Sequence, residues 1–196
     1  MSIQNIIFDL GNVLIEYDFD LFYQKIGYEK GERHLDEAAE SIILFESGKI
    51  SAAEFLSQMQ KIYNFSMTLE DFKKHWAEVF WENKTMINLA RSINQKYPTF
   101  LFSNTDEIHF PYIWQKFSSL HFFQDRLMLS YELGEVKPDL DSYKKALEKF
   151  GLNAKNTVFI DDRPKNIEAA KKFGMQGIVH KDFNSTKEQL EKILNK

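Results

Sequence analysis

One stretch decides the fold of this chain: Phe8-Asp9-Leu10-Gly11-Asn12-Val13-Leu14. It closes an apolar run that begins at Ile3, and a short run of this kind is typical of a strand buried in a parallel sheet. Asp9 ends this strand, just before a turn that contains a glycine and an asparagine. Open α/β sheets place ligand sites at this edge, so Asp9 is a candidate site residue; the alternative is that it only terminates the strand.

Later apolar runs resemble the first strand, and helical patterns separate some of them. The expected strands are Thr99–Ser103, Thr157–Asp161, Gly177–His180 and the less regular Leu127–Tyr131. The expected helices are Leu140–Phe150 and Lys165–Phe173, each followed by the glycine that often stands just past a helix end. Because strand and helix alternate, the sequence predicts an α/β fold, a Rossmann-like parallel sheet with helices on both faces.

The stretch 16–82 has a different pattern, with amphipathic helical spacing and no convincing strand. Capping-box spacing, Ser51 with Glu54 and Thr68 with Asp71, supports two of the helix starts. We therefore predict a small all-helical cap domain at 16–82, inserted into an α/β core made of 1–15 and 83–196. Its expected helices are Asp18–Ile26, Arg33–Glu46, Ser51–Tyr63 and Thr68–Trp81.

Composition narrows the range of partners. The 196 residues are 43% hydrophobic and carry a net charge of -4, which gives no electrostatic reason to bind nucleic acid. The chain has no cysteine, which excludes disulfides and thiolate chemistry. No apolar run reaches membrane-spanning length, and no signal segment is evident. We expect a cytoplasmic protein with no membrane or nucleic-acid partner; the sequence is silent on oligomeric state, for which a monomer is the default.

Two polar motifs follow the expected strands and suit phosphate binding. Ser103 and Asn104 stand where a helix is expected to begin, so the serine hydroxyl and nearby backbone amides would face phosphate oxygens. Taken alone, the same motif is a common helix cap. Lys137 stands immediately before Pro138 and can present its ammonium group to a phosphate.

A third motif predicts a metal site. Asp161 and Asp162 are adjacent carboxylates at the end of an apolar strand, where their mutual repulsion is costly without a cation. Mg²⁺ prefers hard oxygen ligands of this kind.

In their order along the chain, Asp9, Ser103, Lys137 and the Asp161-Asp162 pair resemble the four motifs of the haloacid dehalogenase-like superfamily. The resemblance implies a phosphatase acting on a small phosphorylated metabolite, in which Asp9 attacks phosphorus and Ser103 and Lys137 bind phosphate. It also implies that Asp162, with Asp161 beside it, holds Mg²⁺ together with Asp9 and the main-chain carbonyl of residue 11. The cap would close over the site and select the substrate.

Within that superfamily, the chain is most similar to bacterial phosphatases that act on glucose 1-phosphate. They share Phe-Asp-Leu-Gly-Asn-Val, Ser-Asn-Thr, Lys-Pro and a paired Asp with this sequence. His109 and Glu46-Ser47-Gly48 are also similar, although a histidine near a site more often packs or hydrogen-bonds than takes part in catalysis.

Gly11 departs from the family pattern, because the usual phosphatase has a general acid and base Asp at this position. Losing such a group costs about 10²- to 10⁴-fold in rate. A sugar 1-phosphate would suffer less, since its hemiacetal oxygen leaves more readily as an anion. Glu16, Asp18 and Asp106 are the candidates for a replacement base, and the sequence does not choose among them.

Two alternatives stay open at this point. Haloacid dehalogenases also lack the second Asp, but they typically lack the paired metal-binding acids, so Asp161-Asp162 favours a phosphatase. The other alternative is a non-catalytic module that binds phosphate esters and has lost turnover together with the Asp at position 11.

Overall fold

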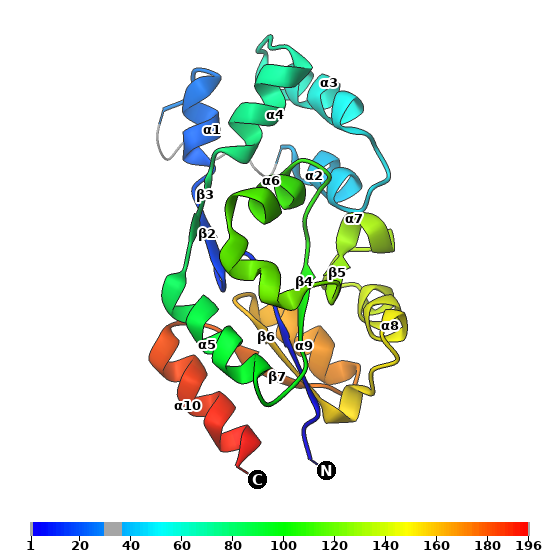
Figure 1. The fold of residues 1–196 in the computed structure, drawn as a ribbon. Coiled ribbons are helices and arrows are strands. Elements are labelled where there is room, and N and C mark those ends of the chain that lie inside the picture. The colour runs from blue at the N-terminus through cyan, green and yellow to red at the C-terminus, as the bar shows by residue number, and fades with distance from the viewer. Residues whose placement is uncertain (1, 30–36, 196) are drawn as a thin grey trace.

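The central sheet is fully parallel. Within residues 2–29 and 37–195, which the computed structural model describes, five strands form it in the order β5-β4-β1-β6-β7 (Figure 1). The strands are β1 (Asn5–Phe8), β4 (Thr99–Ser103), β5 (Leu127–Leu129), β6 (Thr157–Asp161) and β7 (Gln176–Val179). The predicted parallel α/β sheet is confirmed. The run expected as a strand at Leu127–Tyr131 leaves the sheet early, because a short helix, α7 (Ser130–Leu133), begins inside it.

Helices cover both faces of the sheet, as predicted, because side chains of a strand alternate between its two faces. Ile6 and Phe8 of β1 belong to the core on the side of α5 (Lys84–Asn94) and α10 (Phe183–Leu194). Ile7, between them, belongs to the core beneath α8 (Leu140–Lys149) and α9 (Pro164–Lys172). The α8 and α9 helices were predicted, whereas α5 and α10 were not. A helix was also expected after β4, and α6 (His109–Lys116) is that helix, although it begins later than expected. None of the described helices is long and apolar enough to cross a membrane.

A group of helices follows β1 in the chain and lies at the end of the molecule farthest from α10 (Figure 1). The group consists of α1 (Asp20–Lys25), α2 (Ala39–Glu46), α3 (Ala52–Tyr63) and α4 (Leu69–Ala77). The capping box that starts α3 is confirmed, since the Ser51 side chain accepts from Glu54 N and Glu54 accepts from Ser51 N. The predicted start of α2 at Arg33 lies outside the described residues.

The expectation that 16–82 contains no strand was wrong. The predicted helix Thr68–Trp81 ends at Ala77, and β3 (Phe80–Glu82) then pairs antiparallel with β2 (Ile15–Tyr17). Phe80 is 8% exposed and Trp81 45%, so side chains alternate here with the period of a strand. The two paired strands β2 and β3, the β2–β3 ribbon, lie at the predicted boundaries of the cap. A separate cap domain at 16–82 stays a prediction.

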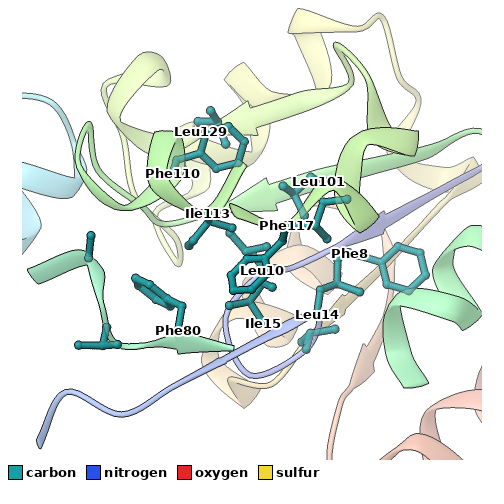
Figure 2. Close-up of a cluster of buried hydrophobic side chains, with 14 of the residues drawn as sticks. Phe8, Leu10, Leu14, Ile15, Phe80, Leu101, Phe110, Ile113, Phe117 and Leu129 are labelled. Carbon is teal, nitrogen blue, oxygen red and sulfur yellow. The ribbon is translucent and has the colours of Figure 1, made fainter. Parts of the chain in front are cut away.

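Packing joins the helical group to the sheet. Figure 2 shows Leu14, Ile15 and Phe80 of the ribbon region in one buried cluster with Leu101 of β4 and Ile113 of α6. The same cluster extends to aromatic side chains of the helical group, which include Phe22, Phe55 and Trp76. A continuous apolar core therefore holds the helices against the sheet.

The turn after α2 is fixed to the segment after β5. The Ser130 hydroxyl donates to the carbonyl oxygen of Glu46 at 2.5 Å and accepts from the Thr105 N–H at 2.9 Å. Gly48 has a φ of 66°, and a Cβ added to it would overlap the carbonyl oxygen of Tyr131. Only glycine allows this close approach together with this backbone conformation.

We predict that Gly48→Ala destabilises the fold much more than Gly151→Ala. Gly151 has nearly the same φ, 63°, but a Cβ there would meet nothing within 4 Å. Backbone strain alone should cost Gly151→Ala about 1 kcal/mol. Overlap with Tyr131 should cost Gly48→Ala roughly 2 kcal/mol more. Urea unfolding of both variants measures the difference in their free energies of unfolding. Equal losses of stability in the two variants would show that the contact with Tyr131 is not tight.

Candidate active site

A cavity of about 540 Å³ opens at the carboxyl ends of the strands, where open α/β sheets bind ligands. Its polar wall comes from the segments that follow β1, β4 and β6, and its apolar wall includes Phe45 of α2, Phe55 of α3 and Trp76 of α4. The cavity is lined by most of the predicted site residues: Asp9, Gly11, Ser103, Asn104, Lys137 and Asp162. Asp161 lies behind this surface and is fully buried.

The centre of the site is the buried ammonium group of Lys137. Its Nζ lies 2.7 Å from Asp9 Oδ1 and 2.8 Å from Asp161 Oδ2, and it donates to the carbonyl oxygen of Phe102 at 2.9 Å. These charge-assisted contacts hold the lysine between the ends of β1, β4 and β6. They engage one Asp9 oxygen, and Oδ2 accepts no hydrogen bond from the described side chains.

Asn104 holds the main chain of Lys137 in place. The Asn104 side chain donates to the Lys137 carbonyl at 3.0 Å and accepts from the Lys137 N–H at 2.8 Å. Because these two hydrogen bonds engage the Asn104 side chain, the group of Asn104 that is available to bind an anion is its backbone N–H. The predicted phosphate-binding role of Asn104 stays a prediction.

Ser103 ends β4 and lines the cavity, but the expectation of a helix start at this point was wrong. The helix α6 begins only at His109. The carboxylate of Asp106 accepts from the N–H groups of Ile108 and His109, each at 2.8 Å, so Asp106 satisfies the free amides at that helix start.

The two adjacent acids after β6 have different environments. Asp161 Oδ1 accepts from the Arg163 N–H at 2.8 Å and from Asn166 Nδ2 at 2.9 Å. Its Oδ2 accepts from Lys137 Nζ and again from Asn166. Both oxygens are thus engaged. Asp162 is only half-buried and accepts one described hydrogen bond, at 3.1 Å on Oδ2 from the side chain of Asn12.

These carboxylates form a cluster suited to a hard cation. One oxygen from each of Asp9, Asp161 and Asp162 lies within 4.8 Å of the others. Because Asp161 is engaged by the protein, the oxygens available for coordination belong to Asp9 and Asp162. An all-oxygen set with few protein ligands fits Mg²⁺, which keeps several waters in its shell.

The charge state of Asp9 depends on its neighbours. Burial raises the pKa of Asp9, Lys137 opposes the rise and Asp161 adds to it, so that the pKa lies at about 7 instead of 3.8. The ionised form is therefore costly near neutral pH, and a cation beside Asp9 would favour the carboxylate.

The ring of Tyr17 takes the space beside Gly11. A Cβ added to Gly11 would lie 3.0 Å from Tyr17 Cε1. The Tyr17 hydroxyl accepts from Asn12 Nδ2 at 3.2 Å. An aspartate side chain at position 11 would thus begin against this ring.

His109 makes two structural contacts, which agrees with the expectation that it packs or hydrogen-bonds. Its Nδ1 lies 2.8 Å from Asp106 Oδ2 and its Nε2 2.9 Å from the carbonyl oxygen of Trp76. Burial works to raise the pKa of Asp106, but the charge and hydrogen bonds of His109 outweigh it and hold that pKa below its usual value. Asp106 is therefore a fixed carboxylate.

The remaining candidate bases are poorly placed. Neither Glu16 nor Asp18 is among the described residues that line the cavity. Glu16 accepts from Asn83 at 3.3 Å, and Asp18 accepts from the N–H of Asp20 at 3.0 Å. The structure instead places Glu46 on the cavity wall, a residue that the sequence marked only through a family resemblance.

Comparisons with known proteins agree on one family. Residues 3–174 match the profile of the haloacid dehalogenase-like hydrolases. The chain is 30% identical to D-ribitol-5-phosphate phosphatase of Bacteroides thetaiotaomicron, over 98% of this chain and 99% of that protein. It is 42% identical to glyceraldehyde 3-phosphate phosphatase of Methanocaldococcus jannaschii over a shorter part, 32% of this chain and 28% of that protein.

Solved structures show the same fold. A crystal structure of a HAD family enzyme from B. thetaiotaomicron superposes with a TM-score of 0.82 at 26% identity, covering 92% of this chain and 95% of that one. A crystal structure of the wild-type enzyme in complex with magnesium and inorganic phosphate gives a TM-score of 0.79 at 25% identity, with the same coverage.

We predict that Lys137→Met costs about 3 to 5 kcal/mol of stability, because it leaves two buried carboxylates without their counter-charge. Adding Asp161→Asn to this variant should recover part of the loss, since one of the two charges is then removed. Lys145→Met, which breaks an exposed ion pair with Glu135 (3.1 Å), should cost less than about 1 kcal/mol. Urea unfolding at neutral pH in the presence of EDTA measures the free energy of unfolding of the three variants. A Lys137→Met loss no larger than that of Lys145→Met would contradict the bridging role.

Proposed function

Because the chain belongs to the haloacid dehalogenase-like hydrolase family, we propose that it is a Mg²⁺-dependent phosphatase of a small phosphorylated metabolite, with Asp9 as the nucleophile. One observation carries this proposal: the Lys137 ammonium holds Oδ1 of Asp9 at 2.7 Å, Oδ2 accepts no hydrogen bond from the described side chains, and Asp9 lines a cavity beside a carboxylate cluster that could hold a cation. Names of relatives at 30% and 42% identity, both phosphatases of small phosphorylated compounds, agree with it.

The chain's own residues would perform the reaction in two displacements. The Ser103 hydroxyl and the Asn104 N–H would bind phosphate oxygens. The Lys137 ammonium, whose three N–H groups already have protein acceptors, would stabilise the phosphate through its positive charge. Asp9 Oδ2 would attack phosphorus while the ester bond breaks and its electron pair leaves on the ester oxygen. Water would then attack phosphorus, and the electron pair of the phosphorus–Asp9 bond would return to the carboxylate. Mg²⁺, held by Asp9, Asp162 and the Gly11 carbonyl, supplies charge neutralisation for the phosphate oxygens when bound.

The cavity favours an organic substrate of modest size. Its apolar wall would cover the carbon skeleton of a sugar or polyol, and its volume is in the range of small-molecule sites. The leaving-group argument from Gly11 favours a sugar 1-phosphate, whereas the names of the relatives favour an alkyl phosphate of a polyol or a short sugar. Both classes belong in the first screen.

We predict Mg²⁺-dependent release of phosphate from at least one member of a panel of sugar 1-phosphates, sugar and polyol 5- and 6-phosphates, nucleotides and haloacids. Asp9→Asn should abolish turnover, because an amide oxygen is a poor nucleophile, while Asp18→Asn, outside the cavity, should retain it. Mass mapping after rapid quench should place the phosphoryl group on Asp9.

Three results of that screen would reject this function or its mechanism. Halide release without Mg²⁺ would identify a dehalogenase. Binding of phosphate esters and Mg²⁺ with no turnover across the panel would identify a binding module. A phosphoryl group on any residue other than Asp9 would reject the assigned nucleophile.

A further inference from the structure

Glu46 is an acidic side chain of the cavity to which the proposed mechanism gives no role. It is the last residue of α2, so it reaches the cavity from the helical group, whereas Asp9 reaches it from the sheet. The charged groups that face it are Asp106, His109, Lys137 and Arg163. Among the described residues, none donates a hydrogen bond to its carboxyl group.

The backbone that carries Glu46 is held on several sides. Its carbonyl oxygen accepts from Ser130, and the next residue, Ser47, donates from its side chain to the Leu44 carbonyl at 3.1 Å. Gly48 then packs directly on the backbone of Tyr131. Such anchoring is what a proton-transferring group requires, because its position must be reproducible to within a fraction of an ångström.

Three other titratable groups of the cavity wall, His109, Asp106 and Lys137, are already engaged. Both ring nitrogens of His109 face oxygen acceptors, the Asp106 carboxylate and the Trp76 carbonyl, and both contacts are satisfied only when each nitrogen carries a proton. Asp106 accepts from His109 and from two backbone amides. The Lys137 ammonium is committed to two carboxylates and a carbonyl.

We propose that Glu46 is the general acid and base of this enzyme and replaces the aspartate that Gly11 lacks. As Asp9 Oδ2 bonds to phosphorus and the ester bond breaks, the Glu46 carboxyl gives its proton to the leaving oxygen and an alcohol is released. As water attacks the phosphorus of phospho-Asp9, the Glu46 carboxylate takes a proton from that water, and Asp9 and inorganic phosphate are released. The inference rests on the proposed phosphatase function and adds one residue to it.

The electrostatic surroundings suit both roles. Burial raises the pKa of Glu46 and the charge of Asp106 adds to the rise, while Arg163, His109 and Lys137 oppose it, so that the pKa lies at about 7. A carboxyl group of this kind holds a proton below that pH and releases it above, so near neutrality it can both give and accept one. Protonated Glu46 is needed for the first step, and kcat/KM for an alkyl phosphate should therefore fall as the pH rises through about 7.

The test compares Glu46→Gln with the matched control Glu16→Gln, on the best alkyl phosphate of the panel and on p-nitrophenyl phosphate. Glu46→Gln should lower kcat/KM for the alkyl ester by about 10²-fold or more. It should change kcat/KM for the nitrophenyl ester much less, because nitrophenolate leaves without a proton. The fall of kcat/KM above pH 7 should disappear in Glu46→Gln. Glu16→Gln should match the wild type, and Glu46→Asp should recover part of the alkyl rate.

The outcomes separate this inference from the proposed function. Turnover by the wild type with equal losses on both esters in Glu46→Gln, or with no loss at all, overturns the role of Glu46 alone. Turnover by neither the wild type nor any variant overturns the phosphatase function, and this inference with it. Accumulation of phospho-Asp9 in Glu46→Gln with the nitrophenyl ester supports the base role in the second step.

Discussion

The site depends on one buried interaction, the Lys137 ammonium between the carboxylates of Asp9 and Asp161. Removing these charges from water is costly, and a buried ion pair of this kind is weak evidence for stability. The interaction instead determines where the two carboxylates lie and how strongly they repel each other. It draws together the ends of three strands, fixes one oxygen of Asp9 and reduces the repulsion between two neighbouring carboxylates. The surrounding polar groups, from the Asn104 pair to Asn166, serve to hold this triad.

Much of the site follows from the sequence because parallel strands end at one edge. Ser103 and Asp161 each end a buried apolar strand and Asp9 directly follows another, and these strands are neighbours in the sheet. Any correct prediction of the strands therefore brings the three residues together. The position of Lys137 is different, since it lies in a segment without its own strand signal. The Lys-Pro pair alone is a weak signal for phosphate binding, which the family resemblance strengthened, and the contact with Asp9 joins residues 128 positions apart.

The features that the sequence did not predict depend on contacts between distant residues. The strand β3 is only three residues long, and its pairing with β2 is visible only once the helices between them are folded. The difference between Asp161 and Asp162 arises from Lys137, the Arg163 N–H and Asn166 on the following helix, all of which donate to the first of the two acids only. Neither spacing nor residue type reveals that difference.

Gly11 and Glu46 are related through the packing of the helical group. A glycine at position 11 allows the Tyr17 ring to lie against the loop that follows Asp9, in the space where the usual acid would begin. An acidic side chain at position 11 would keep its position in the cavity even if the helical group shifted relative to the sheet. An acid on α2 keeps its position only while the contacts of Ser130 and Gly48 hold that helix against the segment after β5. Proton transfer in this enzyme would then depend on how α2 packs, and one helix would both form part of the cavity wall and supply the proton for release of the product.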